Sequence, residues 1–184
     1  MNEAQLVDKM KKIKLFSSDI DGVMTDAGMY YSETGDELKK FNTRDGGGFM
    51  LLQLVGVKTV LITSETVDLV KKKKKKLKVD YLFQVTGDKW FTMEKLIREL
   101  GLQPENVSHI GDDINDITLM EKVGLRFAVA DAVDDVKSRV DIVLKKKGGE
   151  GAVREAAELI LRKTGKYDQA LEKYFELKRN VRSR

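Results

Sequence analysis

The sequence of 184 residues contains no cysteine, one proline and one histidine. The absence of cysteine excludes a disulfide framework, a thiolate nucleophile and a zinc site built on sulfur. A single histidine, His109, cannot form a histidine-rich zinc site. Any metal ion bound by this chain therefore has to use oxygen ligands.

Long apolar runs are missing as well. No run approaches the roughly 18 residues of a membrane-spanning helix, and residues 1–16 lack the apolar stretch of a signal peptide. We therefore expect a cytoplasmic protein that does not enter a membrane. The net charge is +4 because 34 basic residues face 30 acidic ones, so the small excess requires no nucleic-acid partner. The length favours a single domain over residues 1–184.

Short segments rich in β-forming residues alternate with segments whose apolar residues recur every three or four positions. This alternation predicts an α/β fold with a parallel sheet covered by helices on both faces. Ligands gather at the carboxyl ends of the strands in such sheets. The expected strands are 13–18, 58–62, 81–85, 107–110, 127–130 and 141–144. The expected helices are 49–55, 67–77, 91–100, 115–123 and 152–161, followed by a tail over 167–184 that begins as a helix and frays.

One segment, about 28–43, departs from this alternation. Tyr30 and Tyr31 precede a turn signal at residues 34–36, and alternating residues come after it, which predicts a β-hairpin. Because it comes directly after the first strand, we expect the hairpin to project from the carboxyl edge of the sheet. It could serve there as a lid or contact a partner subunit.

A run of lysines occupies residues 71–76. Val67, Val70 and Leu77 mark one face of the surrounding helical pattern. This favours a solvated helix in which the stems of Lys73 or Lys74 cover apolar surface. A nucleic-acid-binding surface is the alternative, and it predicts salt-sensitive binding to DNA or RNA.

Two carboxylates, Asp19 and Asp21, come directly after the first predicted strand. Strand alternation places them on one side, and Gly22 lets the backbone turn and approach a phosphate closely. Clustered carboxylates repel each other unless a cation or a proton intervenes. Mg²⁺ suits this position because it prefers oxygen ligands and often binds together with a substrate phosphate.

A second acidic cluster, residues 111–116, comes after the fourth predicted strand and is expected at the same edge. Asp112 is placed to join the metal site, whereas Asp113 or Asp116 could hold waters or orient Lys89. The alternative for this stretch alone is an Asp-rich cap of the next helix. The predicted metal ligands are Asp19, Asp21 and Asp112.

Two further element ends supply groups suited to a phosphate. Thr63 and Ser64 close the second predicted strand and offer a hydroxyl and backbone amides at the start of a helix. Lys89 begins another helix and could place a fixed positive charge against a phosphoryl group. Each signal is weak alone, because Ser and Thr are common helix caps and lysines are common on surfaces. Their occurrence together with both acidic clusters is what favours a phosphate site.

These elements, in this order, resemble the motifs of the haloacid dehalogenase superfamily of phosphatases over nearly the whole chain. Residues 21–26, 41–46 and 148–155 are similar, more narrowly, to the capless phosphatases of phosphorylated ulosonic acids. Those enzymes act on 3-deoxy-manno-octulosonate 8-phosphate or on the 9-phosphates of deoxynononate and neuraminate. The resemblance implies a Rossmann-like sheet without a separate cap domain. It also implies a homotetramer in which hairpins and a neighbour's C-terminal segment help to close each site.

By this resemblance Asp19 attacks phosphorus and forms an aspartyl phosphate, while Asp21 protonates the leaving alkoxide and then activates water. Mg²⁺ and Lys89 would offset the charge of the phosphoryl group. Side-chain chemistry agrees, because a carboxylate can act as a covalent catalyst and a neighbouring carboxyl group can carry the proton.

The substrate within the family depends on the two residues after Thr63. Octulosonate phosphatases usually carry Gly-Arg there, whereas Ser64-Glu65 resembles the deoxynononate branch more closely. A carboxylate cannot contact an anionic sugar acid as arginine does, so we expect Glu65 to bind sugar hydroxyls or an intersubunit basic group. Arg44 and Arg154 are candidates for binding the substrate carboxylate, with structural salt bridges as their alternative.

Two other classes of protein share parts of this pattern. A noncatalytic oligomerisation or binding module of the same fold resembles the C-terminal domains of animal sialic-acid cytidylyltransferases, which have lost motif carboxylates. All of the motif residues are present here. A phosphorelay receiver domain would place its acceptor Asp at a later strand and would lack the hairpin and the second acidic cluster. The sequence therefore favours a magnesium-dependent phosphatase acting on a phosphorylated sugar acid.

Overall fold

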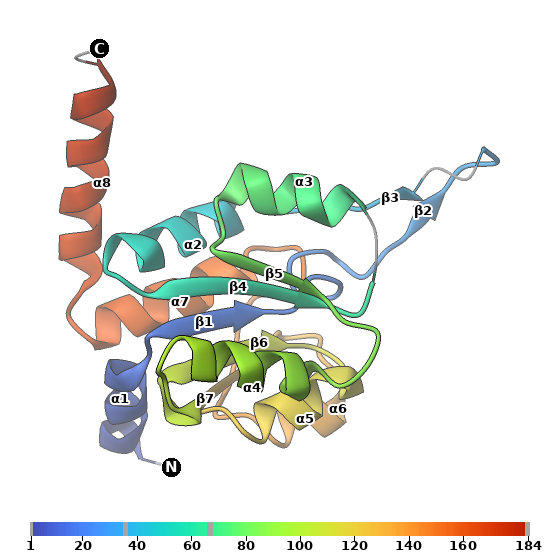
Figure 1. Cartoon of the computed structure of the whole chain (residues 1–184), viewed down its shortest axis with the longest axis horizontal. Coiled ribbons are helices and arrows are strands. Elements are labelled where there is room, and N and C mark those ends of the chain that lie inside the picture. Colours follow the sequence, from blue (N-terminus) through green and yellow to red (C-terminus); the bar gives the residue numbers. More distant parts are fainter. Residues whose placement is uncertain (1, 35–36, 66–67, 183–184) are drawn as a thin grey trace.

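The computed structural model describes residues 2–34, 37–65 and 68–182. Its centre is a six-stranded sheet in the order β5-β4-β1-β6-β7-β8 (Figure 1), in which every pair of neighbours is parallel. The strands are β1 (Leu15–Ser18), β4 (Lys58–Thr63), β5 (Tyr81–Gln84), β6 (Val107–Gly111), β7 (Leu125–Ala128) and β8 (Ile142–Val143). All six expected strands are confirmed, with ends that differ by one or two residues.

The strand order is that of a Rossmann fold. From the centre of the sheet, β1, β4 and β5 follow one another toward one edge, and β6, β7 and β8 follow one another toward the other edge. A receiver domain has one strand on the first side of its central strand, so the observed order excludes that alternative. The topological switch point lies between β1 and β6, because the connections from these strands lead to opposite edges of the sheet. A crevice for ligands opens beyond the carboxyl ends of these two strands.

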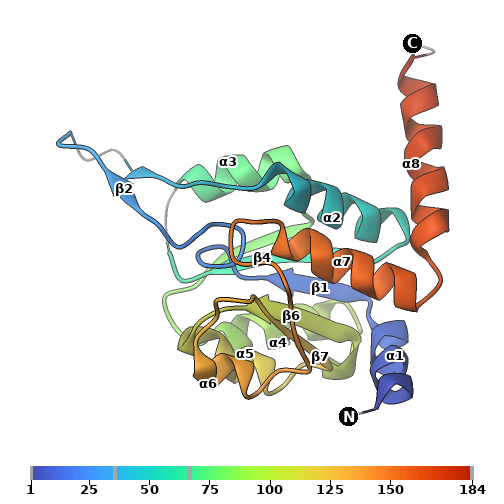
Figure 2. The ribbon, with the colours of Figure 1, turned by 180° about the vertical axis from the view of Figure 1, so that it is seen from behind.

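Helices cover both faces of the sheet. Helices α2, α3 and α7 pack on one face, and α4 and α5 pack on the other (Figures 1 and 2). The α-helices are α1 (Glu3–Lys12), α2 (Thr43–Leu54), α3 (Asp68–Leu77), α4 (Lys89–Glu99), α5 (Ile117–Met120), α6 (Asp134–Lys137), α7 (Ala152–Lys163) and α8 (Tyr167–Arg182), and the 3-10 helices are η1 (Pro104–Asn106) and η2 (Ile114–Asp116). None of the described helices is long and apolar enough to cross a membrane.

The core forms because consecutive side chains of a strand point to opposite faces. Phe16 of β1 packs in the cluster under α2 and α7, while Leu15 belongs to the cluster under α4 and α5. Phe16 meets Phe49 edge to face, with ring centroids 6.0 Å apart. Burying one such ring stabilises the fold by roughly 1.5–3 kcal/mol, so both faces of β1 hold the sheet to its helices.

The expected hairpin is present between β1 and α2. Its strands β2 (Tyr30–Tyr31) and β3 (Glu37–Leu38) are antiparallel and project from the carboxyl edge of the sheet (Figures 1 and 2). The turn expected at 34–36 falls largely outside the described residues. A bridge between Thr25 and Phe41 closes the base of the hairpin.

Helix α2 begins six residues before the expected start at Phe49. Asn42 caps it by accepting a hydrogen bond from the Arg44 backbone N–H at 3.0 Å. Three glycines in its first turns conceal the helical pattern, yet close packing needs them. A Cβ on Gly48 would lie 2.9 Å from the Arg154 Cα of α7.

Three other differences concern helix ends and short helices. The helix expected over 115–123 is shorter and is preceded by η2, while α1 and α6 were not expected at all. The tail over 167–184 is helical as α8 through Arg182, and its expected fraying falls on residues outside the described part.

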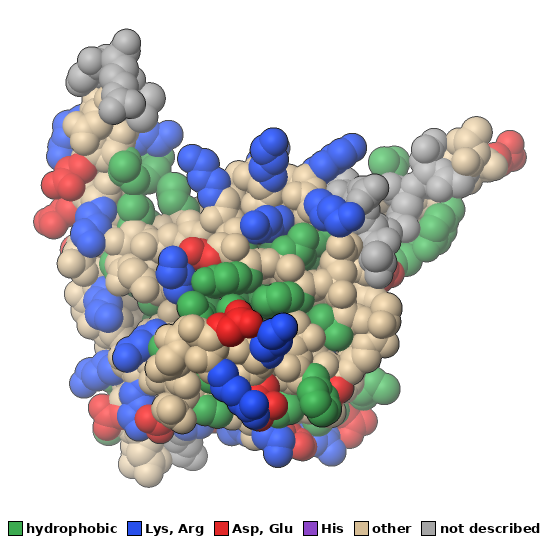
Figure 3. All heavy atoms as spheres, viewed as in Figure 1, with side chains coloured by type: hydrophobic (Ala, Val, Ile, Leu, Met, Phe, Trp, Pro, Cys, Tyr) green, Lys and Arg blue, Asp and Glu red, His purple; other side chains and the backbone are tan. Residues whose placement is uncertain are grey.

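The lysine run lies on α3, as expected. Val70 is buried, and basic side chains stand out into solvent over α3 (Figure 3). The side chains of Val67 and Lys73, which the expected helix face included, lie outside the described part of the chain.

Candidate active site

Asp19 stands at the end of β1 and is the buried centre of the site. Its backbone N–H donates to the Ile110 carbonyl of β6 at 3.0 Å, which holds the side chain at the crevice between the two strands. Its Oδ1 lies 3.0 Å from Lys89 Nζ. Burial and the nearby Asp116 raise the pKa of Asp19, and the Lys89 ammonium opposes this shift. The carboxylate therefore needs nearby positive charge to stay ionised.

Lys89 supplies part of that positive charge. It is fully buried at the start of α4, where the Asp88 side chain caps the helix by accepting from the Trp90 N–H at 2.9 Å. Burial alone would lower the pKa of Lys89, but Asp116 and Asp19 outweigh it and raise that pKa. The side chain is therefore a fixed ammonium group against Asp19, and its predicted role against a phosphoryl group stays a prediction.

Asp116 is the second buried carboxylate that contacts Lys89. Its Oδ1 accepts from Lys89 Nζ at 2.7 Å and from His109 Nε2 at 3.0 Å, and its Oδ2 accepts from the Asp112 backbone N–H at 3.1 Å. Burial alone would raise the pKa of Asp116, but the His109 hydrogen bond and the charge of Lys89 lower that pKa to about 2. Asp116 thus orients Lys89, one of the roles considered for it.

His109 is a member of the site that the sequence did not indicate. Burial lowers its pKa, so the ring is neutral, and Asp116 can only accept a hydrogen bond. Nε2 therefore carries the proton and donates to Asp116, while Nδ1 accepts from the Ser17 hydroxyl at 3.1 Å. The only sequence signal was strand alternation, which points His109 of β6 and Ser17 of β1 to the same face.

Asp112 comes after β6 and has an oxygen that suits a cation. Its Oδ1 is buried and accepts no hydrogen bond from the described residues. Burial and the charges of Asp116 and Asp113 raise the pKa of Asp112 to about 7, which a bound cation would reverse. Ligand atoms of Asp19, Asp112 and Asp116 lie within 4.8 Å of one another. Both oxygens of Asp116 already accept hydrogen bonds, so Asp19 and Asp112 are the carboxylates best placed for a metal.

Gly22 leaves room for Asp112. Its φ is +82°, and a Cβ there would lie 1.8 Å from Asp112 Oδ2. The backbone at Gly22 therefore passes close to the Asp112 carboxylate, and its predicted approach to a phosphate stays a prediction.

Asp21 stands apart from these buried carboxylates, nearer the surface. Its Oδ1 accepts from Lys39 Nζ at 2.8 Å, and its Oδ2 lies 3.5 Å from the Thr63 hydroxyl. The group of three carboxylates contains Asp116 in place of Asp21. Nothing in the sequence marked Lys39, because it is one of many lysines.

The predicted residues meet in a cleft of about 270 Å³ at the carboxyl edge of the sheet. It is lined by Asp19, Asp21, Ala27, Thr63, Ser64, Glu65, Asp112, Asp113 and Asn115. Asp113 also caps η2 by accepting from the Ile114 N–H at 2.7 Å, so the capping alternative holds for that residue. Lys89 lies below this lining, in contact with Asp19.

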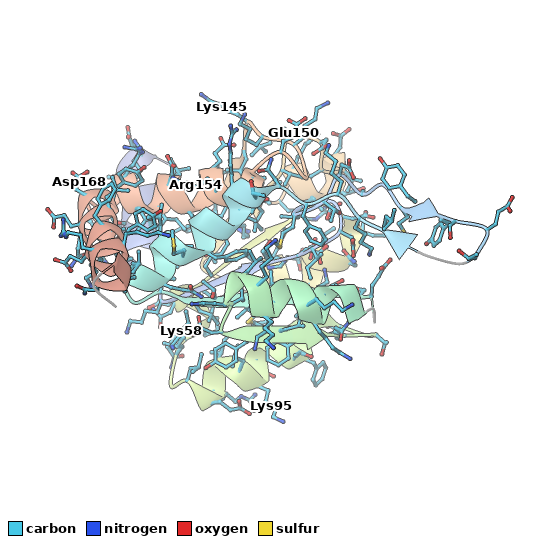
Figure 4. All side chains as sticks on the ribbon, turned by 90° about the horizontal axis from the view of Figure 1, so that it is seen from above. Lys58, Lys95, Lys145, Glu150, Arg154 and Asp168 are labelled. Atoms are coloured by element: carbon cyan, nitrogen blue, oxygen red, sulfur yellow. The ribbon has the colours of Figure 1, made fainter. Side chains whose placement is uncertain are left out.

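The two candidate arginines do not line the cleft within one chain. Arg44 is exposed in the first turn of α2. Arg154 lies where α7 packs against α2 (Figure 4), and its Nε donates to Glu158 at 2.6 Å. Within one chain Arg154 thus pairs along its own helix, and its contact with a substrate carboxylate stays a prediction.

Comparison with known proteins decides the family. The family model of haloacid dehalogenase-like hydrolases matches residues 55–156. The 3-deoxy-D-manno-octulosonate 8-phosphate phosphatase of Escherichia coli K12 is 39% identical over 167 residues, which are 91% of this chain and 89% of that protein. This chain belongs to the haloacid dehalogenase-like hydrolases. Because its relatives are phosphatases, it is a phosphoric monoester hydrolase, as predicted.

Solved structures agree with this assignment. The octulosonate 8-phosphate phosphatase of Moraxella catarrhalis, in complex with magnesium, phosphate and KDO, has a TM-score of 0.89 at 30% identity and covers 94% of this chain and 99% of its own. The cobalt-bound phosphatase of Haemophilus influenzae has a TM-score of 0.83 at 31% identity and covers 89% of this chain and 98% of its own. Members of this hydrolase family thus bind a divalent ion, and the present donor set of carboxylates suits one.

Proposed function

We propose that this haloacid dehalogenase-like hydrolase releases phosphate from an ulosonic acid phosphate, with 3-deoxy-manno-octulosonate 8-phosphate as the first candidate. One observation carries the proposal. Asp19, its buried partner Lys89 and the unpaired Oδ1 of Asp112 converge where β1 and β6 end. The eight-carbon substrate is supported by the 39% identity to an octulosonate phosphatase over most of both chains.

In the proposed reaction an Asp19 oxygen attacks phosphorus and the bond to the sugar oxygen breaks, which leaves an aspartyl phosphate. Asp21 gives its proton to the departing alkoxide. Asp21 then accepts a proton from water, the water oxygen attacks phosphorus, and inorganic phosphate leaves with Asp19 restored. Lys89, 3.0 Å from Asp19 Oδ1, orients the nucleophile and offsets negative charge throughout.

We propose Mg²⁺ as the metal, held by Asp19 and Asp112. When bound, it would offset the charges of these carboxylates and of the phosphoryl group. Asp21, the third predicted ligand, lies outside the group formed by the carboxylates of Asp19, Asp112 and Asp116, and its place at the metal stays a prediction.

A nine-carbon substrate is the second candidate, and Glu65 favours it. The Glu65 carboxylate lines the cleft beside Thr63 and Ser64, where octulosonate phosphatases usually carry Gly-Arg. A carboxylate there can accept hydrogen bonds from additional sugar hydroxyls. Deoxynononate and N-acetylneuraminate 9-phosphates offer such hydroxyls.

The test is phosphate release with Mg²⁺ from the octulosonate 8-phosphate and the two 9-phosphates, compared by kcat/KM. Asp19→Asn is the control, and it should lose turnover while keeping its fold by circular dichroism. One substrate preferred by more than about tenfold, or about 1.4 kcal/mol in transition-state binding, would identify the physiological class. The absence of magnesium-dependent release from all three would overturn the substrate class, and turnover by Asp19→Asn would overturn the mechanism.

We also propose that the chain forms a homo-oligomer, with a tetramer as the expected size. The hairpin presents large apolar side chains, with Tyr31 67% and Leu38 66% exposed, and α8 presents Phe175 at 54%. Large exposed apolar groups of this kind favour burial against another surface. Light scattering coupled to size-exclusion chromatography should give a mass of four chains, and a monomer at micromolar concentration would contradict the proposal.

A further inference from the structure

Lys39 lies one residue beyond β3, at the base of the exposed hairpin, yet its own side chain is only 1% exposed. Its Nζ donates to Asp21 Oδ1 at 2.8 Å and also hydrogen-bonds the Glu65 carboxylate. One ammonium group therefore joins the hairpin to the loop after β1 and to the loop after β4.

The neighbouring Lys40 shows how different a surface lysine is. Its side chain is 63% exposed, and its Nζ lies 3.3 Å from Asp26. Exposed pairs of this kind contribute about 0–1 kcal/mol. Removing an ammonium group from water, as at Lys39, is costly unless it is paired and hydrogen-bonded, and here two carboxylates supply that pairing.

Both partners of Lys39 are themselves held in place. Asp21 has Lys39 on one oxygen and the Thr63 hydroxyl 3.5 Å from the other. The Glu65 backbone N–H donates to the Thr63 hydroxyl at 3.1 Å, and its carbonyl accepts from Gln84 Nε2 at 3.2 Å. The position of the Lys39 ammonium thus determines where the Asp21 carboxylate stands relative to the nucleophile.

We propose that Lys39 is a positioning residue that aims Asp21 at the leaving oxygen of the substrate and fastens the hairpin to the cleft. The inference rests on the proposed function, in which Asp21 gives a proton to the departing alkoxide. Lys39 also offsets the negative charge of Glu65 at the rim, which would otherwise repel an anionic phosphate ester. The site therefore takes esters whose departing alkoxide needs a proton.

The test compares Lys39→Met with wild type on two esters. The octulosonate 8-phosphate releases an alkoxide that needs the proton of Asp21, whereas p-nitrophenyl phosphate releases a phenolate that does not. Because general acid catalysis contributes about 10²–10⁴-fold, kcat/KM for the sugar ester should fall by ~10²-fold, and for the aryl ester by about tenfold less. Lys39→Arg, which keeps the charge and the donors, should recover part of the loss on the sugar ester.

Lys40→Met is the matched control, because it removes an adjacent lysine from the same hairpin without touching Asp21 or Glu65. It should keep wild-type kcat/KM on both esters. Melting temperatures of all variants establish that they fold. An equal loss on both esters, or no loss, in folded Lys39→Met would overturn the role of Lys39 in aiming Asp21.

The two proposals fail in different ways. If wild type releases phosphate from the octulosonate ester but Lys39→Met behaves like wild type, the Lys39 proposal fails and the proposed function stands. If wild type does not act on that ester, the proposed substrate fails, and hydrogen exchange still tests Lys39. Backbone amides of the described residues 37–41 should exchange faster in Lys39→Met than in wild type and Lys40→Met, and unchanged rates would contradict its anchoring of the hairpin.

Discussion

The imidazole of His109 and the carboxylate of Asp116 lie 3.0 Å apart in the interior, directly beneath the cleft. Both side chains are fully buried, and Asp116 in turn holds Lys89 against Asp19. The single histidine of the chain thus supports the reactive carboxylate through two intervening groups.

Replacing His109 by Phe should therefore lower both stability and turnover. The loss of the donor leaves a buried Asp116 oxygen with one partner fewer, which costs about 1–3 kcal/mol in the free energy of unfolding. Denaturant titration and kcat measure the two effects. Ser17→Ala, which changes only the far nitrogen of the ring, should cost less, and equal losses in both variants would contradict the role of Asp116.

Gly22→Ala should weaken magnesium binding, because the new Cβ would lie 1.8 Å from Asp112 Oδ2 and displace that carboxylate. Gly56→Ala is a matched control, since its φ of +85° imposes similar backbone strain with nothing within 4 Å of the new Cβ. Both variants should lose stability, but only Gly22→Ala should lose magnesium affinity, measured by calorimetry. Equal affinities in the two variants would rule out the crowding of Asp112.

Asp141 should make the fold sensitive to acid. Burial alone would raise its pKa, but hydrogen bonds from Arg126 and Lys9 outweigh burial and lower that pKa below the ordinary 3.8. The stability from this carboxylate is therefore present above about pH 4 and is lost as the pH falls through the lowered pKa of the folded state. In denaturant titrations Asp141→Asn should lose stability at pH 7 and approach wild type near pH 3. A pH-independent difference would contradict this linkage.

Replacing Arg44 by Ala and replacing Arg154 by Ala should have different effects, the first on substrate binding and the second on stability. If Arg44, which is exposed in the first turn of α2, binds the sugar-acid carboxylate, its loss should raise KM for the octulosonate ester by about 10-fold. The same loss should leave p-nitrophenyl phosphate, which has no carboxylate, unaffected. Arg154 pairs with Glu158, so its loss should lower the melting temperature first. An Arg44 variant with an unchanged KM would remove that residue from the substrate site.

The alternation of strands and helices made the sheet and its reactive edge predictable. Asp19 and Asp112 come after buried strands, and a parallel sheet brings such positions together whatever the loops do. Lys89 was predictable only in combination with them. The start of α2 was not, because three glycines weaken the helical pattern and are explained only by close contacts with α3 and α7.

The contacts of Lys39 and His109 could not be read from the sequence for a different reason. Lys39 pairs with Asp21 and Glu65, which lie 18 and 26 positions away, and His109 contacts Ser17 across 92 positions. Asp116 is only seven positions from His109, but the chain leaves β6 and enters η2 between them, so sequence spacing does not give their distance. Neither residue type is unusual at its position. The closeness of Asp19 and Asp21 in sequence suggested a shared metal, which stays a prediction, but it gave no sign that Asp21 pairs with Lys39. Local spacing indicates which groups share an edge, whereas tertiary ion pairs decide which of them face each other.

Helices α1 and α8 lie at the amino end of the sheet, opposite the hairpin (Figures 1 and 2). The cleft lies at the other end, where it is lined by residues that follow the carboxyl ends of β1, β4 and β6. Neither helix lines the cleft of its own chain. Because the C-terminal segment is expected at a neighbour's site, α1 is the end at which the chain could be extended without lengthening a segment that borders a cleft. An affinity tag, a fluorescent protein or a surface tether attached at α1 would leave the entrance of each protomer's cleft open. The architecture therefore suits immobilised or fused forms of the enzyme, because the attachment point at α1 and the cleft lie at opposite ends of the sheet.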